Sequence, residues 1–458
     1  MASPLDVVIL AAGQGKRMHS ALPKVLHALA GRPLAAHVLT AARAVSPRTI
    51  AVVTGYGAEA VERELAAPDV IFVRQDPPRG TGDAARVALD VLPSDGITLV
   101  GLGDVPLVPA DALAGIVELA RAGSVGLLTA RVRNPFGLGR VIRDTDGNVR
   151  AIVEERDATP QERDVSEINT GFIAAPSALL KRWLARLTPH NAQGELYLTD
   201  IVAMAVADGV PVGTHVVSDE VSILGINDRA QLASLERIVQ RRKAALLMLA
   251  GTTIVDPQRI DIRGQLECGR DVTIDVGCVF EGTVTIGDAA SIGPYCVLRD
   301  VRVGPGSRIE AFSHFDSADI GPNCRIGPYA RLRPGTKLAE DVHIGNFVEV
   351  KASTLGAGSK ANHLAYVGDA IVGRRVNYGA GSITANYDGA NKHQSIIGDD
   401  VQIGSNCVLI APIAIGAGAT IGGGSTIVKE APGGQLTLAR APQVSIARWQ
   451  RPRKKAAT

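Results

Sequence analysis

Glycines and basic residues stand together directly after the first apolar run of the chain. Residues 7–10 are typical of a strand, and they lead into Gly13, Gly15, Arg17 and, a few positions later, Lys24. Glycines let a backbone approach a phosphate chain closely, and free N–H groups there bind anions. The spacing lacks the third glycine of the dinucleotide fingerprint and the Ser or Thr of the Walker motif. By itself, the segment fits an ordinary strand–helix turn as well as a phosphate site.

Three further polar motifs adjoin strand-like runs, at residues 75–82, 103–106 and 167–171. The second of them places Asp104 at the carboxyl end of a strand. A lone aspartate there also serves as a helix cap or turn residue. Close to bound phosphates, however, its carboxylate is a suitable ligand for Mg²⁺, because a hard cation prefers oxygen donors.

A second reactive group lies in the C-terminal half, where His363 carries an imidazole that titrates near neutral pH and can act as a general base. A lone histidine is more often a surface residue. Chemistry is favoured here by polar residues that interrupt an otherwise apolar pattern: Arg333, Lys351, Tyr366, Asn377, Asn386 and Tyr387.

The elements that position this second group follow a period of six residues. An apolar residue, often followed by glycine, recurs at Ile320, Ile326, Leu332, Leu338 and Ile344. Such a period fits a triangular coil of short strands, with the apolar residue inward and a small residue at the fifth position. The register slips around residues 310–317, and a polar loop interrupts the repeat at residues 384–395. A loop that leaves a solenoid is a place to expect function.

The first half of the chain has a different organisation, in which strand-like and helix-like segments alternate. Strands are expected at residues 7–10, 50–54, 70–73 and 97–100, and helices at residues 24–29, 58–65, 84–92 and 111–120. This alternation predicts a mostly parallel sheet covered on both faces, with ligands beyond the carboxyl ends of the strands.

A helix is expected to connect the two halves, capped by Asn227 or Asp228 and stopped by Gly251. Its apolar side is predicted to consist of Leu232, Leu235, Ile238, Val239, Leu246 and Leu249.

The length, net charge and cysteine pattern of the chain narrow the class of protein. A chain of 458 residues predicts two or three domains, and a net charge of +2 favours neither a nucleic-acid nor a membrane partner. The N-terminus lacks the pattern of a signal peptide, so a cytoplasmic protein is expected. Scattered cysteines without a C-x-x-C pair suit a reducing compartment and argue against zinc. Three of them fall at the fifth position of a hexapeptide, where packing explains them: Cys296, Cys324 and Cys407.

Taken together, the motifs resemble the bacterial family of bifunctional N-acetylglucosamine-1-phosphate uridyltransferases and glucosamine-1-phosphate acetyltransferases. The resemblance runs from about residue 7 to residue 453 and is carried by residues 10–18, 22–27, 80–82, 103–107, 167–171, 360–369, 377–381 and 386–389. It implies a Rossmann-like α/β uridyltransferase (nucleotidyltransferase) domain over 1–226 and a connector helix over 227–251. A left-handed parallel β-helix acetyltransferase domain with a C-terminal tail would follow over 252–458.

For the first domain, the resemblance implies roles for individual residues. UTP would be held by Leu10, Ala11, Ala12, Gly13, Arg17, Lys24, Gln75, Gly80 and Thr81, the sugar phosphate by Gly139, Glu154 and Asn169, and Mg²⁺ by Asp104 and Asn227. Two positions depart from the family pattern. Lys16 stands where Thr is usual, and Asp83 stands where His is common. Asp83 would either weaken anion binding or cap the next helix.

For the second domain, the resemblance makes His363 the general base. The amino-sugar phosphate would be bound by Arg333, Lys351, Tyr366, Asn377 and Lys392, and acetyl-CoA by Ala380, Asn386, Tyr387, Ser405, Gly423 and Arg440. The backbone N–H of Ala380 would stabilise the oxyanion. Gly423 replaces the usual Ala. Because such sites lie between neighbouring coils, a homotrimer is implied.

Three other interpretations remain open at this point. The solenoid could be only a trimerisation scaffold for a nucleotidyltransferase, or the whole protein could be a non-catalytic sensor of sugar nucleotides. Zinc-dependent carbonic anhydrases share the hexapeptide repeat, and His314, His343 and His363 could be assigned to such a metal. These histidines lack the closely spaced pair that this alternative requires.

Overall fold

The computed structural model describes residues 3–452 and residue 454. The chain divides into two compact units, Met1–Ile238 and Val239–Thr458. The functional boundaries expected at residues 226 and 251 are finer than this division and stay predictions.

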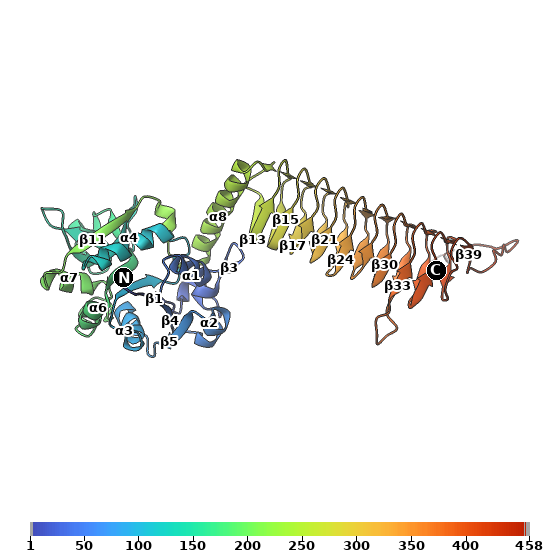
Figure 1. Ribbon diagram of the computed structural model, residues 1–458. Coiled ribbons are helices and arrows are strands. Elements are labelled where there is room, and N and C mark those ends of the chain that lie inside the picture. Colours follow the sequence, from blue (N-terminus) through green and yellow to red (C-terminus); the bar gives the residue numbers. More distant parts are fainter. Residues whose placement is uncertain (1–2, 453, 455–458) are drawn as a thin grey trace. The chain divides into compact units, whose positions relative to one another are not determined.

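The first unit is built on a nine-stranded, mostly parallel sheet (Figure 1). Its strand order is β11-β7-β10-β6-β1-β4-β5, with β8 and β9 added beside β10. Strands β1, β4, β5 and β6 run parallel, whereas β10 is antiparallel to β6 and β7. The bounds are β1 (Leu5–Leu10), β4 (Thr49–Thr54), β5 (Val70–Arg74), β6 (Ile97–Leu102), β7 (Val125–Arg131), β8 (Arg140–Arg143), β9 (Val149–Val153), β10 (Glu167–Pro176) and β11 (Val212–Val217). The short pair β2 (Ala28–Leu29) and β3 (Arg32–Pro33) stands apart.

Helices cover both faces of this sheet because side chains of the buried strands alternate between two cores. Val7 and Ile9 of β1 pack in one core, and Val8 packs in the other. The first core is covered by α1 (Leu34–Ala44), α2 (Ala58–Glu64) and α4 (Ala110–Arg121). The second is covered by α3 (Thr81–Val91), α6 (Ser177–Leu184) and α7 (Asp200–Ala207). The unit also contains α5 (Pro160–Arg163) and the 3-10 turns η1 (Lys16–Met18), η2 (Lys24–Leu26) and η3 (Glu220–Ile223).

One predicted helix is wrong. Residues 24–29 form only the turn η2 followed by β2, and the helix between β1 and β4 is α1 instead. Pro33 precedes the first residue of α1, where its fixed φ and missing N–H suit a helix start. The four predicted strands and the other three predicted helices are confirmed within a few residues.

The connecting helix α8 (Arg229–Leu249) begins where the sequence indicated. The Oδ1 atom of Asp228 accepts a hydrogen bond from the backbone N–H of Gln231 (2.8 Å), which satisfies a free donor of the first turn. Leu235 and Val239 are buried as expected. The predicted apolar side is wrong at two positions, because the side chains of Leu246 and Leu249 are 68% and 86% exposed. Ala244 is buried instead.

The second unit is a left-handed parallel β-helix with three strands in each regular coil, drawn as a stack of coils in Figure 1. One face is an eleven-stranded sheet, which we call face A. It comprises β12 (Thr253–Ile254), β14 (Thr273–Ile274), β16 (Ser291–Ile292), β19 (Arg308–Ile309), β22 (Arg325–Ile326), β25 (His343–Asn346), β28 (Lys360–His363), β31 (Asn377–Tyr378), β34 (Gln402–Ile403), β37 (Thr420–Ile421) and β39 (Leu436–Thr437).

The other two faces of the prism belong to one seventeen-stranded network. It comprises β13 (Ile260–Cys268), β15 (Cys278–Ile286), β17 (Val297–Arg299), β18 (Arg302–Val303), β20 (His314–Asp316), β21 (Ala318–Ile320), β23 (Arg331–Leu332), β24 (Thr336–Leu338), β26 (Glu349–Lys351), β27 (Thr354–Leu355), β29 (Tyr366–Gly368), β30 (Ala370–Val372), β32 (Ile383–Ala385), β33 (Ser395–Ile397), β35 (Val408–Ile410), β36 (Ile413–Ile415) and β38 (Thr426–Ile427). Successive strands of one face therefore bring residues of successive coils side by side.

The core of this prism is formed by the six-residue repeat. The apolar residues of the repeat are buried, as are Cys296, Cys324 and Cys407, so packing explains these cysteines as predicted. Burial raises the pKa of the Cys296 thiol to about 12 and that of Cys324 to about 11, which keeps both thiols protonated.

Aromatic rings line the corner that follows face A. Tyr295, Phe312, Tyr329 and Phe347 stack with centroid distances of 5.3, 5.0 and 5.2 Å. All four have a positive φ, which L residues rarely adopt. Ring stacking offsets part of the cost of this backbone conformation.

The two irregularities predicted from the sequence have different outcomes. At residues 310–317 the strands stay in register, and the step of 17 residues that pairs Arg308 with Arg325 also occurs in other coils, such as the one that pairs Lys360 with Asn377. At residues 386–394 a loop leaves the stack between β32 and β33, so the next pair, Asn377 with Gln402, lies 25 residues apart. The second interruption is a true insertion, visible as the projecting loop in Figure 1.

Candidate functional sites

The parallel strands of the first unit bring three predicted motifs to one edge of the sheet. After β1 ends at Leu10, its carbonyl accepts a hydrogen bond from the N–H of Gly103 (3.0 Å), just beyond β6. After β5, the N–H of Gln75 donates to the carbonyl of Thr54 (2.8 Å), the last residue of β4. The glycine segment, Gln75 and Asp104 therefore share the carboxyl edge, as expected for a ligand site in such sheets.

A lysine, an aspartate and an asparagine from distant parts of the chain converge at this edge. The ammonium of Lys24 forms an ion pair with Asp104 and donates to Oδ1 of Asn227 (3.3 Å). The side chains of Lys24 and Asp104 are each only 15% exposed. Two oxygen donors thus point at one cationic group, an arrangement that also suits a divalent cation.

Gly15 places Lys24 in this position. Gly15 has a φ of 63°, and a Cβ atom there would lie 2.6 Å from Cβ of Lys24. A side chain at position 15 would therefore collide with Lys24, so this position requires glycine. Gly13 has open space around it, and Lys16 and Arg17 are exposed beside it, so this segment presents backbone and positive charge to solvent.

Asp83 is a buried ion-pair centre, which fits neither of the two roles considered for it. Its carboxylate accepts hydrogen bonds from Gln75 (2.9 Å), Arg86 (2.7 Å) and Arg79 (3.2 Å). The side chain is 1% exposed and caps no helix through a hydrogen bond. Burial alone would raise the pKa of this carboxyl, but the three donors hold it below its usual value. Its charge is compensated, so it does not present a free anion to an incoming phosphate.

The segment around Gly80 is fitted tightly against residues 196–198. A Cβ atom on Gly80 would lie 2.6 Å from the carbonyl oxygen of Leu196, and its φ of 110° favours glycine. Thr81 accepts a hydrogen bond from the N–H of Leu198 through its hydroxyl (3.1 Å). This packing fixes the start of α3 beside Gln75.

The three residues assigned to the sugar phosphate lie close to one another. The N–H of Asn169 donates to the carbonyl of Gly139 (2.8 Å), and a Cβ atom on Gly139 would be 3.3 Å from Oε2 of Glu154. Burial raises the pKa of the Glu154 carboxyl, while a hydrogen bond from Thr199 (3.0 Å) opposes that rise. Sequence reasoning missed Thr199, because no motif marks it.

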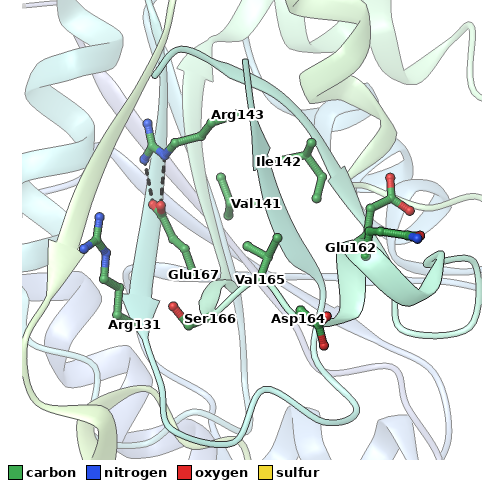
Figure 2. Close-up of a pocket in the computed structure, with 10 residues that line it drawn as sticks. Arg131, Val141, Ile142, Arg143, Glu162, Asp164, Val165, Ser166 and Glu167 are labelled. Atoms are coloured by element: carbon green, nitrogen blue, oxygen red, sulfur yellow. Dashed lines mark hydrogen bonds and ion pairs between the residues drawn. The ribbon is translucent and has the colours of Figure 1, made fainter. Parts of the chain in front are cut away.

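A separate hollow of about 550 Å³ lies beside β8 and β10 (Figure 2). Figure 2 shows Arg143 paired with Glu167, whose carboxylate also accepts a hydrogen bond from Thr129. None of its lining residues belongs to the predicted site. Glu167, the first residue of the motif at residues 167–171, therefore links β7, β8 and β10 rather than facing the substrate edge.

In the second unit, His363 lies at the end of β28 on face A and is exposed. Its Nδ1 atom is 3.0 Å from Oδ1 of Asn346, its register partner on the preceding coil. With an amide oxygen as acceptor, Nδ1 carries the proton and Nε2 keeps a free lone pair. The tautomer thus suits a general base that acts through Nε2. Sequence reasoning missed Asn346, although the register of the repeat places it directly beside His363.

Around the next corner, a polar network holds Lys351. Its ammonium lies 3.4 Å from Oδ2 of Asp369, and Asn386 donates to the same oxygen. Asn386 also contacts the hydroxyl of Tyr366 (3.4 Å). Asp369 was not among the predicted site residues, yet its carboxylate joins two of them, Lys351 and Asn386.

Two further cations lie near Lys351. Arg333 is paired with Glu349 (2.9 Å), and Lys392 comes from the inserted loop, where it pairs with Tyr387 as an isolated bridge. The side chain of Lys351 lowers the pKa of Lys392, which identifies them as close neighbours. Arg333, Lys351 and Lys392 face two carboxylates, those of Glu349 and Asp369, so a net positive charge remains that suits an anionic ligand.

Three of the residues assigned to acetyl-CoA, Ala380, Ser405 and Gly423, follow His363 along the same column of face A, whereas Asn386 and Tyr387 belong to the inserted loop. Register pairs Lys360 with Asn377 and Asn377 with Gln402, which aligns His363, Ala380, Ser405 and Gly423 on successive coils. Arg440 donates to the carbonyl of Gly423 (2.9 Å). The structure therefore joins these predicted residues in one continuous line.

The three histidines considered for zinc lie apart within one chain. His314 belongs to β20 of the seventeen-stranded network, whereas His343 and His363 lie at opposite ends of strands on face A. Among the described residues, no cluster of three potential metal-binding side chains of the His, Cys, Asp or Glu type occurs. Nor is any described helix long and apolar enough to cross a membrane.

The fold and both sites define a two-part transferase, with a nucleotidyltransferase sheet and a hexapeptide-repeat β-helix. The family described as the MobA-like NTP transferase domain matches residues 7–165. The family described as the GMPPB C-terminal domain matches residues 262–354 and 320–415.

Full-length relatives make the assignment specific. Proteins named bifunctional protein GlmU are 55% identical in Methylibium petroleiphilum, 56% in an Azoarcus species and 54% in Nitrosospira multiformis. The matches cover 98%, 98% and 99% of this chain, and 100%, 99% and 99% of those proteins. The chain belongs to the GlmU family of bifunctional proteins. The fold class and the family predicted from the motifs are thus confirmed.

Proposed function

We propose that this protein catalyses two steps of UDP-N-acetylglucosamine synthesis. The β-helix acetylates glucosamine-1-phosphate with acetyl-CoA, and the N-terminal sheet then joins the product to UMP from UTP. Membership in a family of bifunctional proteins, together with two polar sites on two architectures, supports this function.

We assign uridylyl transfer to residues 1–226, the connector to 227–251 and acetyl transfer to 252–458. Substrates of this kind fit a cytoplasmic location.

Uridylyl transfer is an in-line displacement. A phosphate oxygen of N-acetylglucosamine-1-phosphate attacks the α-phosphorus of UTP, the bond to the β-phosphate breaks, and pyrophosphate leaves. Lys24 and Arg17 offset negative charge on the phosphates, and the backbone at Gly13 allows close approach. Gly139, Glu154 and Asn169 hold the sugar so that its phosphate faces the nucleotide. Positioning and charge stabilisation account for the catalysis.

Mg²⁺ fits the oxygen donors of Asp104 and Asn227, which already converge on the ammonium of Lys24. When bound, the cation supplies charge neutralisation at the phosphates of UTP. Lys24 would then turn from Asp104 toward the nucleotide.

Acetyl transfer requires a neutral amine, because an ammonium has no lone pair for attack. Nε2 of His363 takes the proton, the amine nitrogen attacks the thioester carbonyl, and the carbon–sulfur bond breaks to release coenzyme A. The N–H of Ala380 stabilises the oxyanion. Arg333, Lys351 and Lys392 bind the phosphate, with Tyr366 and Asn377 beside it. Asn386, Tyr387, Ser405, Gly423 and Arg440 contact acetyl-CoA.

A homotrimer is the proposed assembly. His363 projects from face A, whereas Lys351 and Tyr366 belong to strands of the seventeen-stranded network across the corner at Leu364. A closed ring of three copies joins two different surfaces of neighbouring chains. In the proposed trimer, one copy contributes His363 and Asn377 of face A, and the next contributes Lys351 and Tyr366.

Two point variants test the proposal. His363→Ala should abolish acetyl transfer, measured as thiol release from acetyl-CoA, and keep uridylyl transfer, measured as pyrophosphate release from UTP. Asp104→Ala should do the reverse, because the two sites lie in separate units. A folded variant that loses both reactions would contradict the assignment. A wild type that releases pyrophosphate but never thiol would identify the solenoid as a scaffold.

A further inference from the structure

A row of basic residues on face A has no role in the site described above. Arg308, Arg325, His343 and Lys360 occupy the same position on four successive coils, as the strand register shows. We call these four residues the basic strip. Neighbouring strands lie about 4.8 Å apart, so the strip is about 14 Å long. Three of the side chains are exposed and His343 is half-buried.

The strip lines a hollow of about 430 Å³. Among the residues that the structure describes, no carboxylate lies within 4.0 Å of the charged nitrogens of Arg308, Arg325 or Lys360. The nearby acids are Asp341, which lines the hollow, and Glu310, which follows β19. Neither forms an ion pair with the strip.

Arginines on the other faces provide the contrast. Arg299 pairs with Glu281, Arg331 and Arg333 pair with Glu349, and Arg302 approaches Asp319 at 4.0 Å. The charge of each of these four arginines is thus compensated, whereas the charge of the strip is not. Burial lowers the pKa of His343, and the cations Arg325 and Lys360, with His363 beyond them, lower it further. The positive charge of the strip is therefore available to bind an anion.

The strip also leads to the acetyl-transfer site. Its next member in register is Asn377, one of the residues assigned to the sugar phosphate. Lys360 and His363 are the first and last residues of β28, so the strip runs about 10 Å from the column of the proposed base. A phosphate captured at the strip lies next to the place where it is needed.

We propose that the basic strip is an anion-docking surface that gathers the phosphate-bearing acetyl acceptor before it enters the site at His363. This inference rests on the proposed acetyl transfer. Docking raises the local concentration of the sugar phosphate and its rate of association, and it leaves the chemical step unchanged. The strip therefore acts on KM for the acceptor and not on kcat.

The double variant Arg308→Gln with Arg325→Gln tests the strip without touching the assigned site. At low ionic strength, KM for glucosamine-1-phosphate should rise about fivefold with kcat unchanged. Near 1 M salt, where the screening length falls to about 3 Å, the KM values of the variant and the wild type should become equal. The matched control is Arg302→Gln, an exposed arginine on another face, which should leave KM unchanged. An unchanged KM in the double variant, a lower kcat, or an equal effect of the control would overturn the proposal.

A second measurement does not depend on catalysis. NMR titration of His343, assigned with His343→Gln, should show a rise of its pKa when inorganic phosphate is added to the full-length protein. The double variant should lose this rise. If the wild type lacks acetyl transfer but shows the phosphate-dependent rise, the proposed function fails while the anion site stands. If acetyl transfer is present and the histidine does not respond, the docking surface fails.

Discussion

Single side chains in this protein are positioned by partners that carry no recognisable motif. His363 is held by Asn346, Lys351 by Asp369, and Glu154 by Thr199. Sequence motifs reveal the groups that meet substrate, because their residue types are chemically restricted. The supporting groups are ordinary polar residues whose importance comes from register and proximity.

Asn346 offers a test at this scale, because its amide oxygen fixes the proton on Nδ1 of His363. In Asn346→Asp, a carboxylate would stabilise the protonated imidazole. The base would then be free only at higher pH, so the acid limb of the acetyl-transfer rate should move upward by about one pH unit. The measurement is the pH dependence of thiol release.

The control is uridylyl transfer by the same variant, whose pH profile should match that of the wild type. Asn346→Ala should instead lower kcat about tenfold without moving the limb upward, because orientation is lost and no charge is added. An Asp variant with the wild-type acid limb would show that Asn346 does not face the working base.

At the scale of elements, periodicity predicted most of the fold and local chemistry explained the failures. The six-residue period placed the coils correctly because each repeat buries its own apolar residue. The predicted helix at residues 24–29 failed because this segment is instead organised around Lys24, whose side chain joins two distant segments. The exposed Leu246 and Leu249 show that helix periodicity identifies an apolar side only where a partner surface exists.

Two glycines on adjacent coils test how closely the backbones of these elements pack. A Cβ atom on Gly404 would lie 2.5 Å from the backbone nitrogen of Gly423, so Gly404→Ala forces neighbouring backbones apart. At Gly423 itself, the nearest atom to a Cβ would be the carbonyl oxygen of Ser405 at 3.3 Å. Gly404→Ala should therefore lower thermal stability and raise KM for acetyl-CoA several-fold. Gly423→Ala, the matched control, should change both only slightly.

Thermal denaturation and acetyl-transfer kinetics measure the two effects. Equal losses in both variants would mean that Gly423 contacts the coenzyme through space that a methyl group fills. Normal behaviour of both would mean that the coils separate easily, contrary to the unbroken hydrogen bonding between β31, β34 and β37.

At the scale of the whole molecule, two architectures carry two reactions that share an intermediate. The acetylated sugar phosphate keeps its phosphate, which is the nucleophile of the second reaction. The sequence predicted this division because the residue periods of the halves differ. It could not give the geometry of the acetyl site, because His363 and Lys351 belong to different faces of the prism.

That separation leads to a complementation experiment. His363→Ala and Lys351→Ala should each be inactive in acetyl transfer as pure proteins. After the two are unfolded together and refolded as a mixture, some sites should combine an intact His363 from one copy with an intact Lys351 from the next. Random assembly gives each site one chance in two for either residue, so up to about a quarter of the wild-type activity should return.

The control mixture of His363→Ala with Asn346→Ala should recover far less, because these residues share face A of one copy. If the first mixture stays inactive while both proteins form trimers, one chain must bring both faces to the same substrate, and the shared site is excluded.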